Sequence, residues 1–182
     1  MSTTFRGITT VIFNASALFY EDETGIQAMP HIREVLEFLK SKNIHLVSCF
    51  KEGDDPQTAL NVTGLEDLFT TEGNLQAIYV SQETDRAKEL NLRPLTYYNA
   101  LKAIGVDDMD SVATIAGHYE EIKEARASSI QKVIGFYGSP TIPLGQVQAY
   151  KSNLERDVTA LAGTKLTTAN LREIPEYIGP NL

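Results

Sequence analysis

Residues 30–50, PHIREVLEFLKSKNIHLVSCF, decide the fold that the sequence predicts. Pro30 is typical of the first turn of a helix. The apolar residues that follow it recur at helical spacing, and they are Ile32, Val35, Leu36 and Leu39. The apolar run 44–50 comes next and is typical of a short buried strand. The stretch therefore predicts an amphipathic helix that packs on a sheet and leads into a strand of that sheet.

The same alternation of apolar runs and amphipathic segments extends in both directions along the chain. Further strands are predicted at 8–14, 77–81, 111–117, 132–137 and 165–168. Further helices are predicted at 55–69 with a break at Gly64, and at 94–106, 120–130, 153–164 and 171–178. The Gly- and Pro-rich segment 138–148 is predicted to be a flexible loop. This pattern is typical of the α/β class: a Rossmann-like, three-layer α/β/α sandwich with a mostly parallel sheet. At 182 residues, the chain is predicted to form a single domain over 1–182.

Composition excludes several classes of partner. The formal net charge is −8, and no cluster of Lys and Arg interrupts the acidic pattern, so nucleic acid is not an expected partner. No apolar run approaches the length of a membrane helix, so no membrane partner is expected either. Cys49 is the single cysteine, and the N-terminus has no signal-peptide pattern. A cytoplasmic protein is the expectation.

The order of elements resembles the haloacid dehalogenase-like superfamily, in its phosphatase-like branch. The resemblance is carried by the strand and loop at 11–19, by residues 30–48, by 93–106, by 115–136 and by the closing 171–178. In that family an apolar strand ends in Asp-x-Asp, where the first Asp is the nucleophile and the second is the general acid/base. Here Asn14 and Ser16 stand at those positions. An amide is a far poorer nucleophile than a carboxylate, and a serine hydroxyl does not titrate near neutral pH.

The other motifs of the family are changed to different degrees. Ser48 fits the hydroxyl residue that binds phosphate, and Arg93 fits loosely the basic residue that neutralises it, so the resemblance implies a residual anion site at Ser48 and Arg93. Members of the family bind Mg²⁺ through carboxylates that follow a Gly. At this position the present chain has Gly117 followed by His118. Glu120 and Glu121 are the weak candidates that remain, and at the start of a helix they equally complement the helix dipole. No metal and no cofactor are expected.

The segment 19–29, FYEDETGIQAM, is too short for the helical cap domain that many relatives insert after the first strand. A core with little or no cap implies an open site, which suits a macromolecular partner or a second copy of the chain as well as a small molecule.

Two functions follow from the resemblance. The first is a non-catalytic relative, a pseudophosphatase that uses the scaffold for binding to another protein or to itself, with room for a small anion in the vestigial pocket. The alternative is an atypical Mg²⁺-dependent phosphohydrolase that acts on a phosphate ester, with the metal held weakly by Glu121 and water or another side chain as nucleophile. The loss of the nucleophilic Asp favours the first function, with no catalytic residue expected.

Overall fold

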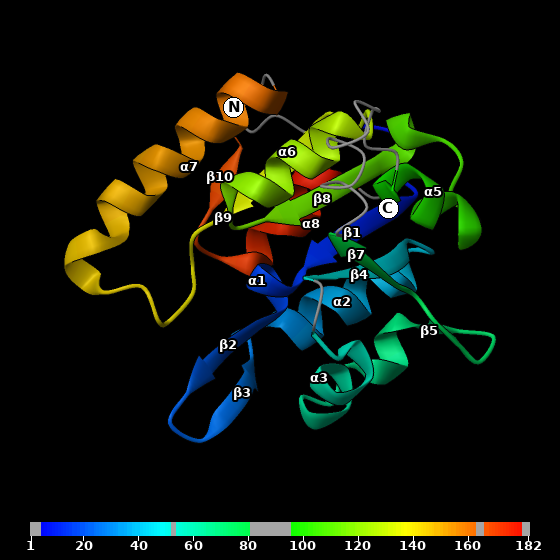
Figure 1. The fold of residues 1–182 in the computed structure, drawn as a ribbon, viewed down its shortest axis with the longest axis horizontal. Helices are drawn as coiled ribbons and strands as arrows, with labels where there is room; N and C mark the ends of the chain where they lie inside the picture. Colours follow the sequence, from blue (N-terminus) through cyan, green and yellow to red (C-terminus); the bar gives the residue numbers. More distant parts are fainter. Residues whose placement is uncertain (1–4, 52–53, 81–95, 163–165, 180–182) are drawn as a thin grey trace.

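The fold is built on one central parallel sheet (Figure 1). The computed structural model describes residues 5–51, 54–80, 96–162 and 166–179. The sheet has six strands in the order β10-β9-β8-β1-β4-β7, and all of its neighbours pair in parallel. These strands are β1 (Thr10–Asn14), β4 (His45–Lys51), β7 (Ala77–Val80), β8 (Val112–Ala116), β9 (Lys132–Phe136) and β10 (Thr167–Thr168). The parallel α/β sheet expected from the sequence is therefore confirmed.

Helices cover both faces of the sheet. One face packs against α5 (Thr96–Ala103), α6 (Tyr119–Ala127) and α7 (Val147–Ala162). The other face packs against α2 (Ile32–Ser41), α3 (Pro56–Val62) and α8 (Ile174–Ile178). Short 3-10 turns complete this set at η1 (Glu66–Phe69), η2 (Met109–Ser111), η3 (Leu144–Gln146) and η4 (Leu171–Glu173).

Alternation along the strands divides the core into two parts. In β1, Val11 and Phe13 pack with α2, whereas Ile12 packs with the α6 and α7 side. In β4, Phe50 belongs to the α2 side and Cys49 to the opposite side. Successive side chains of a strand point to opposite faces, so both faces of this sheet are buried and the strands are apolar almost throughout.

Three local features differ from the sequence prediction. The segment after β1 forms the short helix α1 (Ala15–Leu18) and then an antiparallel hairpin of β2 (Phe19–Asp22) and β3 (Gly25–Ala28). A second small hairpin joins β5 (Thr70–Thr71) to β6 (Asn74–Leu75). Helix α7 begins six residues before the predicted start, inside the segment expected to be a flexible loop, because a 3-10 turn after Pro143 leads directly into it.

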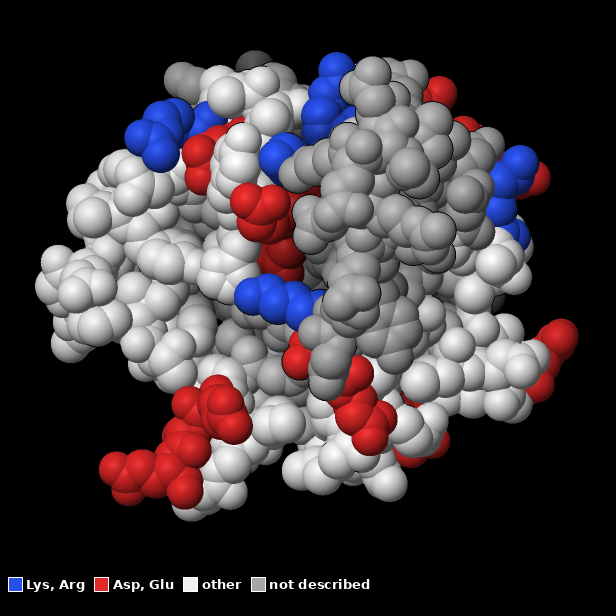
Figure 2. Space-filling view, in the orientation of Figure 1, with Lys and Arg blue, Asp and Glu red and all other residues white. Residues whose placement is uncertain are grey.

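Acidic residues gather in the lower part of the molecule, as drawn in Figure 2. Figure 2 shows acidic side chains gathered over the β2–β3 hairpin and over the start of α3. Glu21, Asp22 and Glu23 lie on the hairpin, and Asp54 and Asp55 precede α3; all five residues are exposed. Within the described residues, no helix has the length and hydropathy of a membrane-spanning segment.

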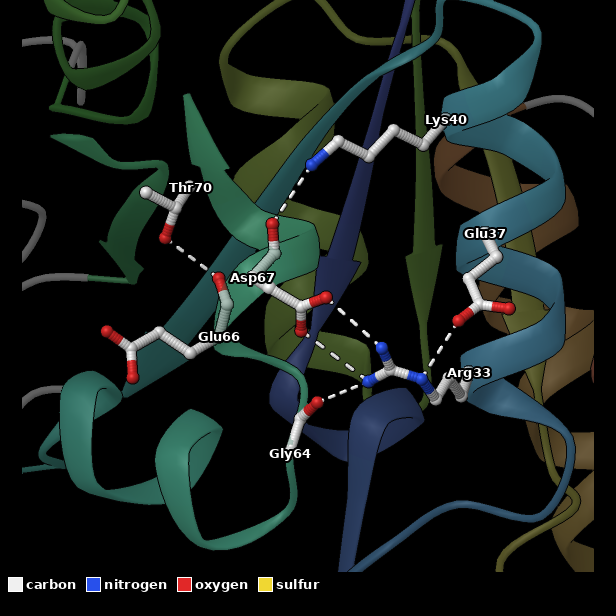
Figure 3. Close-up of polar contacts among 7 residues, drawn as sticks. All are labelled: Arg33, Glu37, Lys40, Gly64, Glu66, Asp67 and Thr70. Atoms are coloured by element: carbon white, nitrogen blue, oxygen red, sulfur yellow. Dashed lines mark hydrogen bonds and ion pairs between the residues drawn. The ribbon is translucent and has the colours of Figure 1, made fainter. Parts of the chain in front are cut away.

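Helix α2 is tied to the chain that follows α3 by a polar network (Figure 3). Arg33 donates to the carbonyl of Gly64 and pairs with Asp67 at 3.1 Å and Glu37 at 2.9 Å. Lys40 donates to the backbone carbonyl of Asp67 at 2.9 Å. Gly64 has a φ of +74°, a left-handed conformation that suits glycine. The predicted helix break at Gly64 is therefore confirmed, and the network fixes the chain beyond it.

Candidate functional site

Three of the residues that the sequence singled out, Asn14, Ser16 and Glu121, lie at the carboxyl edge of the sheet, where β1 and β8 end and α6 begins. Open α/β sheets place their sites at this edge, because the loops after the strands meet there. Asn14 ends β1, Ser16 lies in α1, and Glu121 lies in the first turn of α6. The topology brings Ser16 and Glu121 into contact although 105 residues separate them in the chain.

The side chain of Asn14 is buried and held by the neighbouring strand. Its Nδ2 donates to the carbonyl oxygen of Ile115 at 2.9 Å and to Oγ1 of Thr114 at 3.2 Å. A carboxylate cannot donate, and in the same rotamer it would set an oxygen against the Ile115 carbonyl. Oδ1 of Asn14 is buried without a hydrogen-bond partner among the described residues. The end of β1 is therefore built around an amide.

Ser16, Gly117, His118 and Glu121 form a closed set of hydrogen bonds, here called the Ser16–Glu121 cluster. Oγ of Ser16 donates to Oε1 of Glu121 at 2.7 Å. The same Oε1 accepts from the backbone N–H groups of Gly117 at 2.9 Å and His118 at 3.0 Å. Glu121 thus caps its own helix, which agrees with the structural reading of an acidic residue in a first helical turn. The carboxylate occupies the N–H groups that an external anion would use.

Gly117 allows the cluster to close. A Cβ at this position would lie 2.9 Å from Oγ and 3.1 Å from Cβ of Ser16. Such contacts are tight, so a side chain at residue 117 would push the Ser16 side chain away from its place in the cluster.

Burial dominates the electrostatics of Glu121. Desolvation raises the pKa of its carboxyl above the ordinary 4.5, against the smaller effects of the Ser16 hydroxyl, of His118 and of the two backbone donors. Tyr150 of α7 lies nearby, and burial together with the charge of Glu121 raises the pKa of its phenol.

Replacing Glu121 by Gln should remove a pH dependence of stability. In the native wild type the raised pKa keeps a proton bound in a range where the unfolded chain has released it, so the free energy of unfolding should fall as pH rises through that range. Gln keeps an oxygen for Gly117 and His118 but cannot titrate. We therefore expect wild type to lose stability relative to Glu121→Gln between about pH 4.5 and neutral pH in urea denaturation. A relative gain over that range would show that the hydrogen bonds outweigh burial.

Ser48 is buried in β4, on the strand beside β1. In the β1–β4 register Ser48 pairs with Phe13, and Cys49 pairs with Asn14. Ser48 therefore faces the opposite side of the sheet from Asn14, and its buried hydroxyl donates to the carbonyl of Gln76 at 3.0 Å. The structure does not bring Ser48 and Asn14 together. Arg93 lies outside the described residues, and the anion-binding role of this pair stays a prediction.

Sequence reasoning did not single out Tyr150. Its hydroxyl donates to the carbonyl of Gly117 at 2.9 Å and lies 3.2 Å from Nδ1 of His118. It therefore fixes the loop that carries two backbone donors to Glu121. Tyr150 lies between the predicted loop at 138–148 and the predicted helix at 153–164, so no sequence signal pointed to it.

The side chains at this edge do not fit a magnesium site. Mg²⁺ requires oxygen ligands, with carboxylates to supply negative charge. Asn14 and Ser16 bring no charge, and the Glu121 carboxylate is buried among donors of its own chain. Glu120 is exposed on α6. Among the described residues, no group of three His, Cys, Asp or Glu is placed to hold a metal.

An apolar hollow lies beside the cluster, between the β2–β3 hairpin, the end of β4 and the start of α3. It encloses about 320 Å³, and Phe50, the residue after Cys49 at the end of β4, forms part of its wall together with Ala15 and Phe19. On β4, Cys49 lies level with Asn14, and Phe50 after it lines the hollow.

Comparison with solved structures gives matches across most of the chain. A haloacid dehalogenase-like protein of unknown function from Agrobacterium tumefaciens is 19% identical, with a TM-score of 0.56 over 85% of this chain. A HAD family hydrolase from Deinococcus radiodurans, solved with bound phosphate and sodium, is 12% identical, with a TM-score of 0.63 over 92% of this chain and 93% of its own. A dehalogenase solved as an intermediate complex is 19% identical, with a TM-score of 0.55 over 86% of this chain and 58% of its own.

This chain spans 61% of the length of the Agrobacterium protein. No family model matches the sequence, and no curated protein matches it. The likeness at these identities is one of fold, and activity must be argued from the residues of this chain.

Proposed function

From the premise that this chain has the haloacid dehalogenase-like fold, we propose that it is a non-catalytic member of that architecture, a cytoplasmic protein that uses the scaffold to bind another protein. Two observations support the proposal. The amide of Asn14 is held by hydrogen bonds that only a donor can make. The Ser16–Glu121 cluster uses the remaining hydroxyl and carboxylate for internal contacts.

The orientation of Asn14 carries the argument. The first step of the family's chemistry requires a carboxylate oxygen that attacks a phosphorus or carbon atom and forms a covalent intermediate. Here the side chain in that position donates to Ile115, and its remaining oxygen is buried. An amide oxygen in this setting has neither the charge nor the access for attack. A single change of residue 14 would not restore them, because the surrounding strand presents acceptors.

The competing function is an atypical Mg²⁺-dependent phosphohydrolase. Its single favourable feature is a carboxylate, Glu121, at the sheet edge where such enzymes work. That carboxylate accepts three hydrogen bonds from its own chain, from Ser16, Gly117 and His118. The hydroxyl beside it, Oγ of Ser16, donates to the same carboxylate at 2.7 Å and belongs to this internal set of hydrogen bonds.

We expect wild type to show no hydrolysis of a panel of phosphate monoesters above the rate without protein, with Mg²⁺ present. Asn14→Asp should remain inactive and should lose about 2 kcal/mol of stability, because two buried hydrogen bonds of roughly 1 kcal/mol each are lost. Phosphate release and urea denaturation measure the two effects.

Asn153→Asp is the matched control, since it makes the same chemical change at an exposed residue within helix α7. It should leave stability nearly unchanged. Saturable hydrolysis by wild type, or full stability and activity in Asn14→Asp, would contradict the proposal.

A further inference from the structure

The apolar hollow beside the Ser16–Glu121 cluster has the features of a binding pocket with a defined chemistry. Its walls come from α1, the β2–β3 hairpin, the end of β4 and α3. At about 320 Å³ it is large enough for one long side chain or a small ligand.

The inner wall is apolar. The rings of Phe19 and Phe50 pack against one another, with a distance of 5.9 Å between their centroids. Ala15, Ile26 and Ala59 extend the apolar surface, and Ile26 is 37% exposed on the hairpin. Such a wall suits the methylene groups of a long side chain, which gain from leaving water.

The rim is acidic. Glu21, Asp54 and Asp55 line the opening, and Asp22 follows Glu21 on the hairpin (Figure 2). Hydrogen bonds from Thr58 lower the pKa of Asp55, and those from Thr24 lower the pKa of Asp22, so both are anionic at neutral pH.

The described residues that line the pocket include no Lys or Arg. Lys51, the residue after Phe50 at the end of β4, is exposed, and it is the basic residue that is nearest in the sequence to a lining residue. The rim therefore keeps an excess of negative charge, in a chain whose net charge is −8.

We propose that this pocket binds an arginine side chain presented by a segment of a partner protein. The aliphatic stem packs on Phe19 and Ile26, and the guanidinium reaches the carboxylates of the rim. Arginine fits best because its planar group donates to two carboxylate oxygens at once while its stem remains in an apolar setting. The inference rests on the proposed binding function and names the chemistry of the partner.

A titration of ¹⁵N-labelled protein with short peptides tests this inference. The probe is a blocked Gly-Gly-Arg-Gly-Gly peptide, and the control peptide carries citrulline, which has nearly the same shape without the charge. We expect saturable shifts of the backbone amides of Tyr20, Ile26 and Phe50, with the citrulline peptide at least tenfold weaker. Absence of shifts at these residues, or equal affinity for both peptides, would overturn the proposal.

Two further probes separate the source and type of the cation. The same peptide with lysine should bind several-fold more weakly, since a point charge lacks the paired donors. Free arginine should bind no more tightly than the peptide. If free arginine binds and the arginine peptide does not, the pocket is a small-molecule site and a protein partner is wrong.

A double variant of the rim, Glu21→Gln with Asp54→Asn, should weaken the arginine peptide about tenfold, since each exposed ion pair contributes a few-fold. Glu72→Gln with Asp107→Asn changes the net charge equally at exposed positions away from the pocket and should leave affinity within about twofold. If both double variants bind the arginine peptide equally weakly, the effect is one of net charge, and the proposed site is wrong. Because binding is read without any activity, hydrolysis by wild type would reject the proposed function separately from this pocket.

Discussion

Replacing Ser16 by Asp should destabilise the protein by about 3 kcal/mol at neutral pH, the range measured when a buried charge is left without a partner. The change sets a second carboxylate against Glu121, which is 5% exposed and lies 2.7 Å from the hydroxyl that is removed. Like charges at this distance in a desolvated site cannot both ionise without a large penalty. Urea denaturation at neutral pH measures the loss.

Two comparisons show whether charge causes that loss. Ser16→Ala removes one hydrogen bond without adding charge and should be destabilised by only about 1 kcal/mol. The Asp variant should regain stability as pH falls, because one of the two carboxyls then becomes neutral. If Mg²⁺ raises the stability of wild type itself at neutral pH, the cluster does accept a metal and our reading of its donor set is wrong.

Gly138→Ala should be the most damaging of the Gly→Ala changes at the described glycines, with a loss of about 3 kcal/mol or more. A Cβ on Gly138 would lie 2.0 Å from the backbone oxygen of Ala169 and 2.8 Å from the ring of Phe136. The first of these atoms belongs to backbone, so relief requires the loop after β9 to move away from the loop after β10. Thermal or urea denaturation detects the loss directly.

Gly145→Ala serves as the control for Gly138. A Cβ there meets nothing within 4 Å, so the same methyl group should leave stability unchanged or slightly raised. Equal effects of the two substitutions would mean that the loops after β9 and β10 are not packed as described.

Much of the fold follows from local sequence because its elements bury complete faces. The run TVIFN forms β1 with all five residues buried, and α2 buries Ile32, Val35, Leu36 and Leu39. Gly64 ends the α3 segment as its conformational freedom predicts. These patterns are strong because apolar period and burial agree along each element.

The hairpin after β1 was not predicted, since its four-residue strands are only partly buried and carry no full apolar face. The turn signal is nonetheless present: Oδ1 of Asp22 accepts from the backbone N–H of Thr24 at 2.8 Å, and Gly25 with a φ of +115° completes the turn. This hairpin supplies one wall of the pocket, so the pocket was not predicted either.

Sequence also located the site edge but not the way its side chains are used. Asn14, Ser16 and Glu121 were all candidates, yet the direction of the Asn14 amide depends on Ile115, and the role of Glu121 depends on contact with Ser16 across 105 residues. The position of Ser48 depends on the pairing register of β4, which local pattern does not fix. Such long-range contacts decide whether the side chains at the carboxyl edge of the sheet can carry out a reaction.

The most direct test of the central claim, that this edge is closed to phosphate chemistry, is a titration of wild type with Mg²⁺ and inorganic phosphate followed by NMR. The signals to follow are the side-chain NH₂ of Asn14 and the backbone N–H groups of Gly117 and His118, which hydrogen bond to Ile115 and to Glu121. We expect these signals to stay unchanged throughout. Saturable shifts of all three groups, absent without Mg²⁺, would contradict the claim and return the chain to the candidate phosphohydrolases.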